Sequence, residues 1–141
     1  MAPLATDTKC KVCVVDGDTS FSQRSFAQKS ANILLTNPDM LACSMLPNHT
    51  LWRRFFGRVR FVVIDEAHMY TGVFGVHVAA VMRRLVRVCL YHRQQQAAPP
   101  APLQFVLSSA TLPHPVEHMR KLVPVHCLTG SLPQRQQQRQ Q

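Results

Sequence analysis

The sequence predicts an α/β domain in which a mostly parallel sheet is flanked by helices. Three observations predict this class: short apolar runs rich in β-branched residues, amphipathic helical patterns between them, and runs that are continuous rather than alternating. Continuous apolar runs are typical of strands buried on both faces, as in parallel sheets. Strands that alternate with helices along a chain are typical of consecutive βαβ units.

Four segments have the strand pattern. Each is short and apolar and is bounded by polar or turn-forming residues. They are Val12–Val15, Ile33–Thr36, Val59–Ile64 and Gln104–Ser108. A weaker fifth candidate is Val125–Leu128.

Three shorter stretches are predicted to be helical. The first, Pro38–Leu46, has Asn37 as its N-cap, because asparagine accepts a backbone hydrogen bond there and proline suits the first helical turn. Asn48–Phe56 is a second candidate. The last, Pro115–Leu122, also begins with proline and is followed by Pro124.

The strongest helical pattern runs from about Val76 to Tyr91. Its apolar residues recur at the i, i+3, i+4 spacing of one buried face. They are Val78, Val81, Met82, Leu85, Val88 and Cys89. Arg83, Arg84 and Arg87 lie largely off this stripe, and we interpret them as a solvated face rather than as a DNA contact.

The composition indicates one intracellular domain with a sizeable core. The chain has 141 residues, of which 46% are hydrophobic, and a domain of this size buries about 70% of its unfolded surface. No membrane span and no signal-peptide pattern are apparent. The predicted domain covers residues 12–128 and contains a surface insertion at 94–102. Residues 129–141 form a Gln/Arg-rich tail that is expected to be disordered, and 1–11 are unassigned.

Charge and cysteine usage restrict the class further. The formal net charge of +9 favours a polyanionic partner such as nucleic acid, although the tail contributes part of it. The five cysteines are odd in number and scattered, which favours reduced thiols over a disulfide framework. Cys10 and Cys13 form a C-x-x-C pair, but no second pair follows at zinc-site spacing.

Polar side chains follow two predicted strands where each strand ends. The string from Asp65 to His68 (DEAH) follows one, and Ser109 and Thr111 follow another. Asp65 suits Mg²⁺, which prefers oxygen ligands and keeps several waters, and Glu66 can orient or deprotonate an attacking water. His68 is near enough to transmit the state of such a site, and the hydroxyls can hydrogen-bond the carboxylate or the imidazole. A solvated turn without catalytic function is the alternative interpretation.

In this order the strings resemble motifs of superfamily-two helicases. Asp65–His68 resembles the D-E-A-H form of the Walker B motif (motif II), Ser109–Thr111 resembles motif III, and Thr36–Met40 resembles motif Ib. The chain is most similar to the Hrq subgroup of RecQ-related DNA helicases and its YprA/MrfA-like relatives. This similarity extends from about residue 12 to 123. It is carried by Asp16–Thr19, Thr36–Leu41, Asp65–Gly75, His77-Val78, Met82–Leu85 and Pro115–Met119.

The resemblance implies part of a RecA-like (P-loop NTPase) domain with ATP and Mg²⁺ as cofactors. Asp65 would contact Mg²⁺ through water, and Glu66 would position the hydrolytic water, with His68 beside them. Ser109 and Thr111 would couple the state of ATP to the grip on DNA.

The resemblance also implies a nucleic-acid grip. Thr36, Asn37 and Asp39 lie where the amides of a helix N-terminus would bind a backbone phosphate. Helix capping is the alternative role of Asn37, and both roles can hold together. Gly17 would let the backbone approach a phosphate closely.

One motif of the family does not occur in the chain. No G-x-x-x-x-G-K-S/T loop is found, and this loop holds the β- and γ-phosphates of the nucleotide. We therefore expect part of an ATP-dependent DNA helicase motor that neither hydrolyses ATP nor unwinds DNA by itself. The missing helicase segments, or a partner, would cover an apolar sheet edge.

Two alternatives stay open. One is a non-enzymatic nucleic-acid-binding module that has lost the motor, and the other is a diverged protein in which the acidic pair is structural. The expected location is intracellular, and the nucleus in a eukaryote.

Overall fold

The computed structural model describes residues 10–96 and 102–124 of the chain. The chain divides into two compact units. The first unit comprises Met1–Val59 and Arg87–Pro100, and the second comprises Arg60–Val86 and Ala101–Gln141. The predicted strand Val125–Leu128, the tail and most of the 94–102 insertion lie outside the described residues.

A parallel pair of strands with a crossover helix opens the first unit. β1 (Val12–Val14) pairs with β2 (Ile33–Leu35), with Val12 opposite Ile33. The connecting helix, α1 (Phe21–Ser30), was not predicted from the sequence. Its start is nevertheless encoded by a capping box, because the Ser20 hydroxyl accepts from the Gln23 amide and the Gln23 side chain accepts from the Ser20 amide.

The predicted helix after β2 is present in two parts. α2 (Pro38–Met40) begins at the predicted cap, since Asn37 Oδ1 accepts from the Met40 amide at 2.7 Å. A π-helix, Leu41–Met45, follows and ends in the buried residues Met45 and Leu46. The next candidate helix, Asn48–Phe56, is confirmed only over α3 (Arg53–Phe56), because hydrogen-bonded turns precede it.

The long helix α4 (Gly72–Gln94) extends beyond both ends of its prediction. The predicted apolar stripe is confirmed, because five of its six members are buried and Val88 is half-buried. The three arginines off the stripe are exposed. The division between the two units falls within α4, at Val86 and Arg87.

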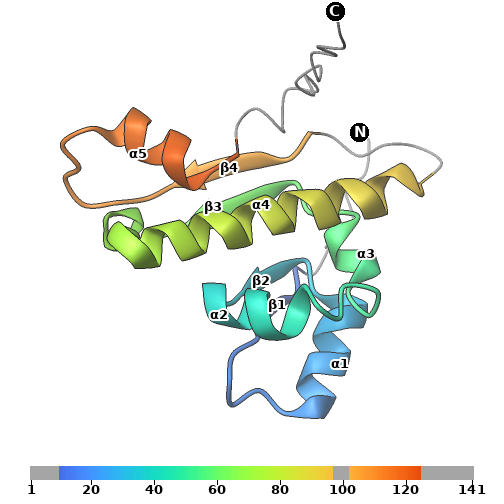
Figure 1. The fold of residues 1–141 in the computed structure, drawn as a ribbon. Coiled ribbons are helices and arrows are strands. Elements are labelled where there is room, and N and C mark those ends of the chain that lie inside the picture. Colours follow the sequence, from blue (N-terminus) through green and yellow to red (C-terminus); the bar gives the residue numbers. More distant parts are fainter. Residues whose placement is uncertain (1–9, 97–101, 125–141) are drawn as a thin grey trace, which may run out of the picture. The chain divides into compact units, whose positions relative to one another are not determined.

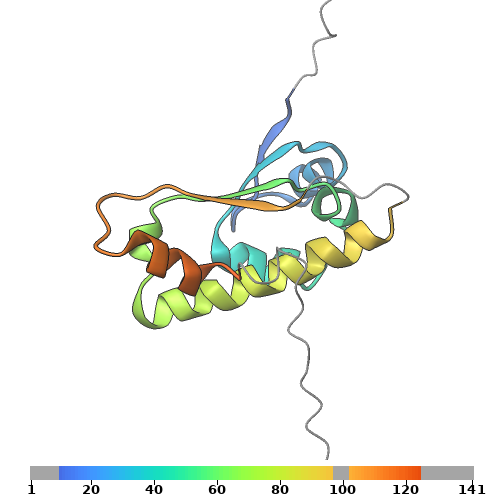
Figure 2. The same cartoon turned by 90° about the horizontal axis from the view of Figure 1, so that it is seen from above.

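The second unit contains the other parallel pair. β3 (Phe61–Ile64) pairs with β4 (Gln104–Leu107), with Phe61 opposite Gln104 and Ile64 opposite Leu107. In Figures 1 and 2 the N-terminal part of α4 runs alongside these strands. α5 (Pro115–Leu122) follows β4 at the predicted residues and ends in the buried Leu122.

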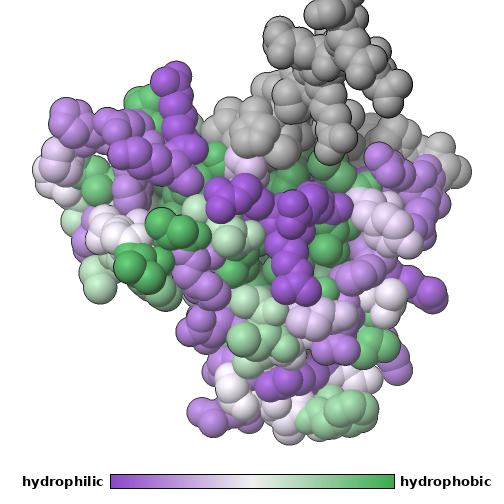
Figure 3. Space-filling model, in the orientation of Figure 1, coloured by the Kyte–Doolittle hydropathy of each residue, from purple (hydrophilic) through white to green (hydrophobic). Residues whose placement is uncertain are grey.

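The expectation that the strands are buried on both faces is wrong for this chain. In each strand the side chains alternate between sides, and the described residues cover only one of them. The uncovered side chains are apolar in most cases, and Figure 3 shows hydrophobic areas at the surface among hydrophilic ones. The exposed apolar strand residues are Val12, Val14, Ile33, Leu35, Phe61, Val63 and Val106.

Candidate functional site

The pairing of β3 with β4 brings together the two polar loops that the sequence singled out. Ile64 lies opposite Leu107, so both strands reach their carboxyl ends at the same edge. Past the ends of the two strands, the backbones of the following residues are still hydrogen-bonded to each other. The Ser108 amide donates to the Ile64 carbonyl at 2.9 Å, and the Ala67 amide donates to the Ser108 carbonyl at 3.0 Å. Asp65–His68 and Ser109 therefore lie beside each other, as predicted.

The backbone turns sharply at Glu66. Its dihedral angles, φ 48° and ψ 42°, lie in the left-handed region, which costs free energy for any residue other than glycine. The turn is closed by two local hydrogen bonds. The Glu66 amide donates to Asp65 Oδ1 at 2.9 Å, and the Met69 amide donates to the Glu66 carbonyl at 2.8 Å. Both carboxylate residues are left exposed at the strand end.

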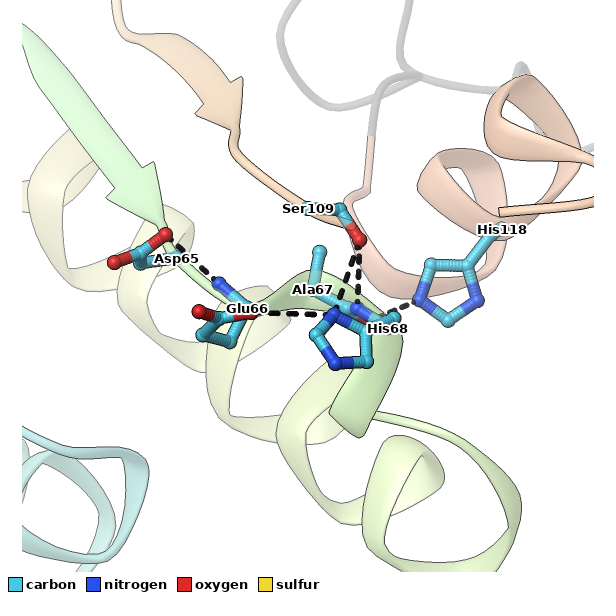
Figure 4. Close-up of polar contacts among 6 residues, drawn as sticks. All are labelled: Asp65, Glu66, Ala67, His68, Ser109 and His118. Atoms are coloured by element: carbon cyan, nitrogen blue, oxygen red, sulfur yellow. Dashed lines mark hydrogen bonds and ion pairs between the residues drawn. The ribbon is translucent and has the colours of Figure 1, made fainter. Parts of the chain in front are cut away.

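The His68 imidazole joins this turn to the end of β4. Its Nδ1 lies 3.3 Å from Glu66 Oε2 and also 3.3 Å from Ser109 Oγ. The Ser109 hydroxyl in addition accepts from the His68 amide at 3.1 Å. A protonated Nδ1 donates to the Glu66 carboxylate, whereas an unprotonated Nδ1 accepts from the Ser109 hydroxyl. The same ring nitrogen of His68 therefore contacts both the Glu66 carboxylate and the Ser109 hydroxyl, as Figure 4 shows.

A further histidine reaches the same turn from α5. His118 Nε2 lies 2.8 Å from the carbonyl oxygen of Ala67, and Ala67 itself is completely buried. The sequence interpretation used His118 only as part of a similar string and gave it no role. The acceptor is a backbone carbonyl, which every residue type has, so side-chain types alone could not predict this contact.

The remaining candidate of this loop is Thr111. It is exposed two residues beyond Ser109, and the described contacts of Glu66 and His68 do not include it. Its coupling role stays a prediction.

The candidate phosphate grip belongs to the first unit. The Thr36 hydroxyl donates to the Val15 carbonyl at 2.7 Å, and the Asn37 side chain caps α2. Asp39 is exposed in the first turn of α2, where its negative charge stabilises the helix N-terminus and would repel a phosphate. The capping role of Asn37 is therefore seen directly, and the phosphate contact stays a prediction.

The loop that contains Gly17 is built by its neighbours. The Thr19 hydroxyl donates to Asp16 Oδ1 at 2.7 Å, and this hydrogen bond holds the pKa of the Asp16 carboxyl below its usual value. The Asp18 amide donates to the same oxygen at 3.1 Å. A Cβ added at Gly17 would meet open space, so no contact in the described structure requires glycine there.

The clustering of possible metal ligands bears on the proposed Mg²⁺ site. Within it, no group of three or more His, Cys, Asp or Glu residues could hold a metal ion. A cation at Asp65 would therefore rely largely on water or on ligands from elsewhere. Among the described helices, none is long and apolar enough to cross a membrane.

Comparison with known proteins relates this arrangement to helicases. The family model of the DEAD/DEAH box helicases matches residues 2–119. The ATP-dependent helicase HRQ1 of Saccharomyces cerevisiae is 45% identical over 114 residues, which are 81% of this chain and 10% of the yeast protein. The ATP-dependent helicase YprA of Bacillus subtilis is 44% identical over 102 residues, which are 72% of this chain and 13% of that protein.

A solved structure shows the same relationship in three dimensions. The crystal structure of the DUF1998 helicase MrfA bound to DNA and AMPPNP superposes with a TM-score of 0.73 at 41% identity. The match covers 82% of this chain and 15% of MrfA. The chain thus spans only a small part of the length of these relatives. The parallel strands flanked by helices match the RecA-like helicase domain of MrfA, and the chain belongs to the DEAD/DEAH box helicase family.

Proposed function

We propose that the chain is part of an ATP-dependent DNA helicase motor and contributes the Mg²⁺-binding, water-activating and coupling elements of its ATPase site. The observation that carries the proposal is the His68 imidazole, whose Nδ1 faces both Glu66 Oε2 and Ser109 Oγ at 3.3 Å. Such a bridge links a carboxylate that can act on water to the segment that follows β4. The names of the relatives, which are ATP-dependent helicases, support ATP as the nucleotide.

The residues at the end of β3 fit a water-mediated Mg²⁺. Asp65 is exposed, and one of its oxygens accepts from the Glu66 amide, which fixes the direction of the carboxylate. Mg²⁺ in nucleotide sites is commonly held by one or two carboxylates, several waters and substrate phosphates. When bound, Mg²⁺–ATP supplies the phosphoryl group and neutralises the charge that develops on it. Asp65 would hold this ion through its water shell.

Glu66 and His68 have complementary roles in this proposal. The Glu66 side chain is 65% exposed and can turn toward a water molecule at the phosphate, where it would orient that water or accept its proton. When the Glu66 carboxylate turns away from His68, Nδ1 keeps its contact with the Ser109 hydroxyl on the segment after β4. Occupancy of the site would in this way change the contact between His68 and the segment that holds Ser109 and Thr111.

The chain by itself is proposed to be inactive. No phosphate-binding loop of the G-x-x-x-x-G-K-S/T type occurs in the 141 residues, and this loop supplies the amide cradle and the lysine for the β- and γ-phosphates. The matched region is about a tenth of the length of yeast HRQ1. The exposed apolar sides of the four strands are proposed to be covered by further helicase segments or by a partner.

DNA is the proposed polymer, because the MrfA structure is described as bound to DNA. The proposed contact lies at the backbone of Thr36, Asn37 and Asp39, because the Asp39 carboxylate itself would repel a phosphate. Gly17 is proposed as a separate point of close approach to the nucleic-acid backbone. Since the Thr36 hydroxyl proton is engaged with Val15, backbone amides would carry the phosphate contact. A helicase of this kind in a eukaryote would act in the nucleus.

The test is an ATPase assay on the purified chain with and without single-stranded DNA. We expect no DNA-stimulated hydrolysis above the background of the Glu66→Gln variant. Stimulated hydrolysis that this substitution abolishes would show that the chain is active alone. Fusion to a segment that contains a phosphate-binding loop should produce activity that again depends on Glu66.

The charge of the chain favours a second candidate, a nucleic-acid-binding module without motor activity. This candidate predicts DNA affinity that falls steeply with salt, because the release of counterions from the phosphates contributes to binding. Fluorescence anisotropy with labelled DNA at several salt concentrations measures the slope. Steep salt dependence, together with no Glu66-dependent hydrolysis after fusion to a segment that contains a phosphate-binding loop, would favour the module over the motor.

A further inference from the structure

We infer that His118 is a positioning residue for the Asp65–His68 turn and ties the shape of this turn to α5. The inference rests on the proposed function of the turn and adds a residue to which that function assigned no role. It starts from the hydrogen bond between His118 Nε2 and the Ala67 carbonyl, 2.8 Å in length, which connects segments far apart in the sequence.

Ala67 is the fixed point of the turn. It is completely buried, and both of its backbone polar groups are engaged. Its amide donates to the Ser108 carbonyl at 3.0 Å, and its carbonyl accepts from the Tyr70 amide at 3.2 Å as well as from His118. The residue after β4 therefore holds the peptide that joins Glu66 to Ala67, and α5 holds the peptide that joins Ala67 to His68.

The neighbours of Ala67 are the two residues that the proposed chemistry uses. Glu66 precedes it in the left-handed conformation, which is unfavourable unless the surrounding structure maintains it. His68 follows it and faces Glu66 and Ser109. Rotation of the Ala67–His68 peptide would change φ of His68, and rotation of the Glu66–Ala67 peptide would change ψ of Glu66. By holding the Ala67 carbonyl, His118 restricts the first rotation, and the Ser108 carbonyl, which accepts from the Ala67 amide, restricts the second.

The hydrogen bond from His118 to the Ala67 carbonyl needs a side chain that donates a proton, but it can form whether the imidazole is neutral or charged. A carbonyl only accepts, so the imidazole must carry a proton on Nε2. Both the neutral tautomer with this proton and the imidazolium can donate it. The terminal amide of glutamine can donate in a similar position, whereas phenylalanine fills a comparable volume and donates nothing.

The path of the chain connects this contact to the coupling segment. The residues between β4 and α5 begin with Ser108, whose carbonyl accepts from the Ala67 amide, and Ser109, which contacts His68. They lead into α5, which contacts Ala67 through His118. The segment and α5 therefore contact the turn at Ser108, Ser109 and His118. A displacement of the segment would act on Ala67 as well as on His68, which the contact at Ser109 alone would not do.

The experiment is an NMR comparison of the purified chain without nucleotide or Mg²⁺. The variants are His118→Phe, His118→Gln and, as a matched control at the start of α5, His114→Phe. His114 is exposed and makes no side-chain capping hydrogen bond. We expect His118→Phe to shift the amide resonances of Glu66, Ala67 and His68 and to speed the exchange of the Ala67 and Tyr70 amides about tenfold, the effect of one net hydrogen bond. His118→Gln should restore both readouts, and His114→Phe should leave them unchanged.

Each other outcome overturns the inference. If His118→Phe lowers stability but leaves the turn amides unchanged, or if glutamine restores nothing, the side chain only packs. If His118→Phe does not fold, the NMR signals of the His118 imidazole in the wild-type chain provide the test. A proton on Nε2 that is protected from solvent supports the contact, and a neutral tautomer with its proton on Nδ1 excludes it. Because no ATP chemistry is measured, failure here leaves the proposed function standing, and an inactive site leaves this result unchanged.

Discussion

The imidazoles of His49 and His92 are hydrogen-bonded to each other, with His49 Nδ1 3.0 Å from His92 Nε2. The contact joins the turn before α3 to the last turns of α4, both within the first unit. The ring of Tyr91 stands edge-on to His49 at a centroid distance of 5.9 Å. His92 is only 6% exposed, so its ring has little access to water.

This pair predicts acid destabilisation of the first unit. Burial lowers the pKa of His92, and the adjacent His49 and the Arg53 guanidinium lower it further. The folded state therefore binds fewer protons than the unfolded chain, whose histidine pKa is about 6.5. The stability is fully present above that pH and is lost as the pH falls below it. Thermal melts from about pH 7 to 5 should show a falling midpoint, and His92→Phe should flatten the curve. Equal slopes in wild type and variant would contradict this, with His114→Gln as the exposed control.

The buried thiol of Cys89 predicts selective cysteine reactivity. Burial raises the pKa of Cys89 to about 12 and also removes its sulfur from solvent. Because the thiolate is the reactive form, Cys89 should be alkylated only as fast as the structure opens. Cys10 and Cys43 are exposed free thiols and should react first. Peptide mass spectrometry after brief iodoacetamide treatment checks the order, and early labelling of Cys89 in folded protein would refute it.

The core of the first unit predicts a large effect at one phenylalanine and a small one at another. Phe56 is 1% exposed, whereas Phe21 is 88% exposed. Phe56→Ala should reduce the free energy of unfolding by about 3–5 kcal/mol, through lost burial and the cavity that remains. Phe21→Ala should change it by less than about 0.5 kcal/mol. Urea denaturation of both variants measures the difference, and similar midpoints would show that Phe56 is not packed as described.

The backbone of Glu66 predicts an unusual preference for glycine. At φ 48° a side chain is unfavourable, so Glu66→Gly should be more stable than Glu66→Ala by about 1 kcal/mol, the cost of the left-handed conformation. In an ordinary strand or helix the order would be reversed. Both variants lack the carboxylate, so the comparison isolates the backbone. Thermal melts in which alanine equals or exceeds glycine would show that the turn does not keep this conformation.

The sequence predicted those parts of the fold whose signals are local. The four described strands and α4 follow from apolar patterning, and Asn37 from the chemistry of capping. α1 was missed because its side chains form no clear apolar stripe, and Phe21 and Phe26 are exposed. Asn48–Phe56 was predicted too long, because tight turns at Asn48–Thr50 replace the first helical turn.

The sequence likewise predicted one part of the candidate site and missed another. The order of its strings predicted that Asp65–His68 and Ser109 belong together, and the β3–β4 register brings them into contact. The link from His118 depends on which side of α5 faces the turn and on a backbone acceptor. Neither is encoded by residue types alone.

The register of β3 and β4 also determines which changes the loop after β4 can absorb. Ile64 is opposite Leu107, and Ser108 is the first residue after β4. Ser108 contacts the turn through its backbone, whose hydrogen bonds go to Ile64 and Ala67. Its side chain is exposed, so many residue types should serve at this position. A deletion there would instead move Ser109 out of step and turn its hydroxyl to the other side. At this point in the molecule, chain length is constrained more tightly than residue identity.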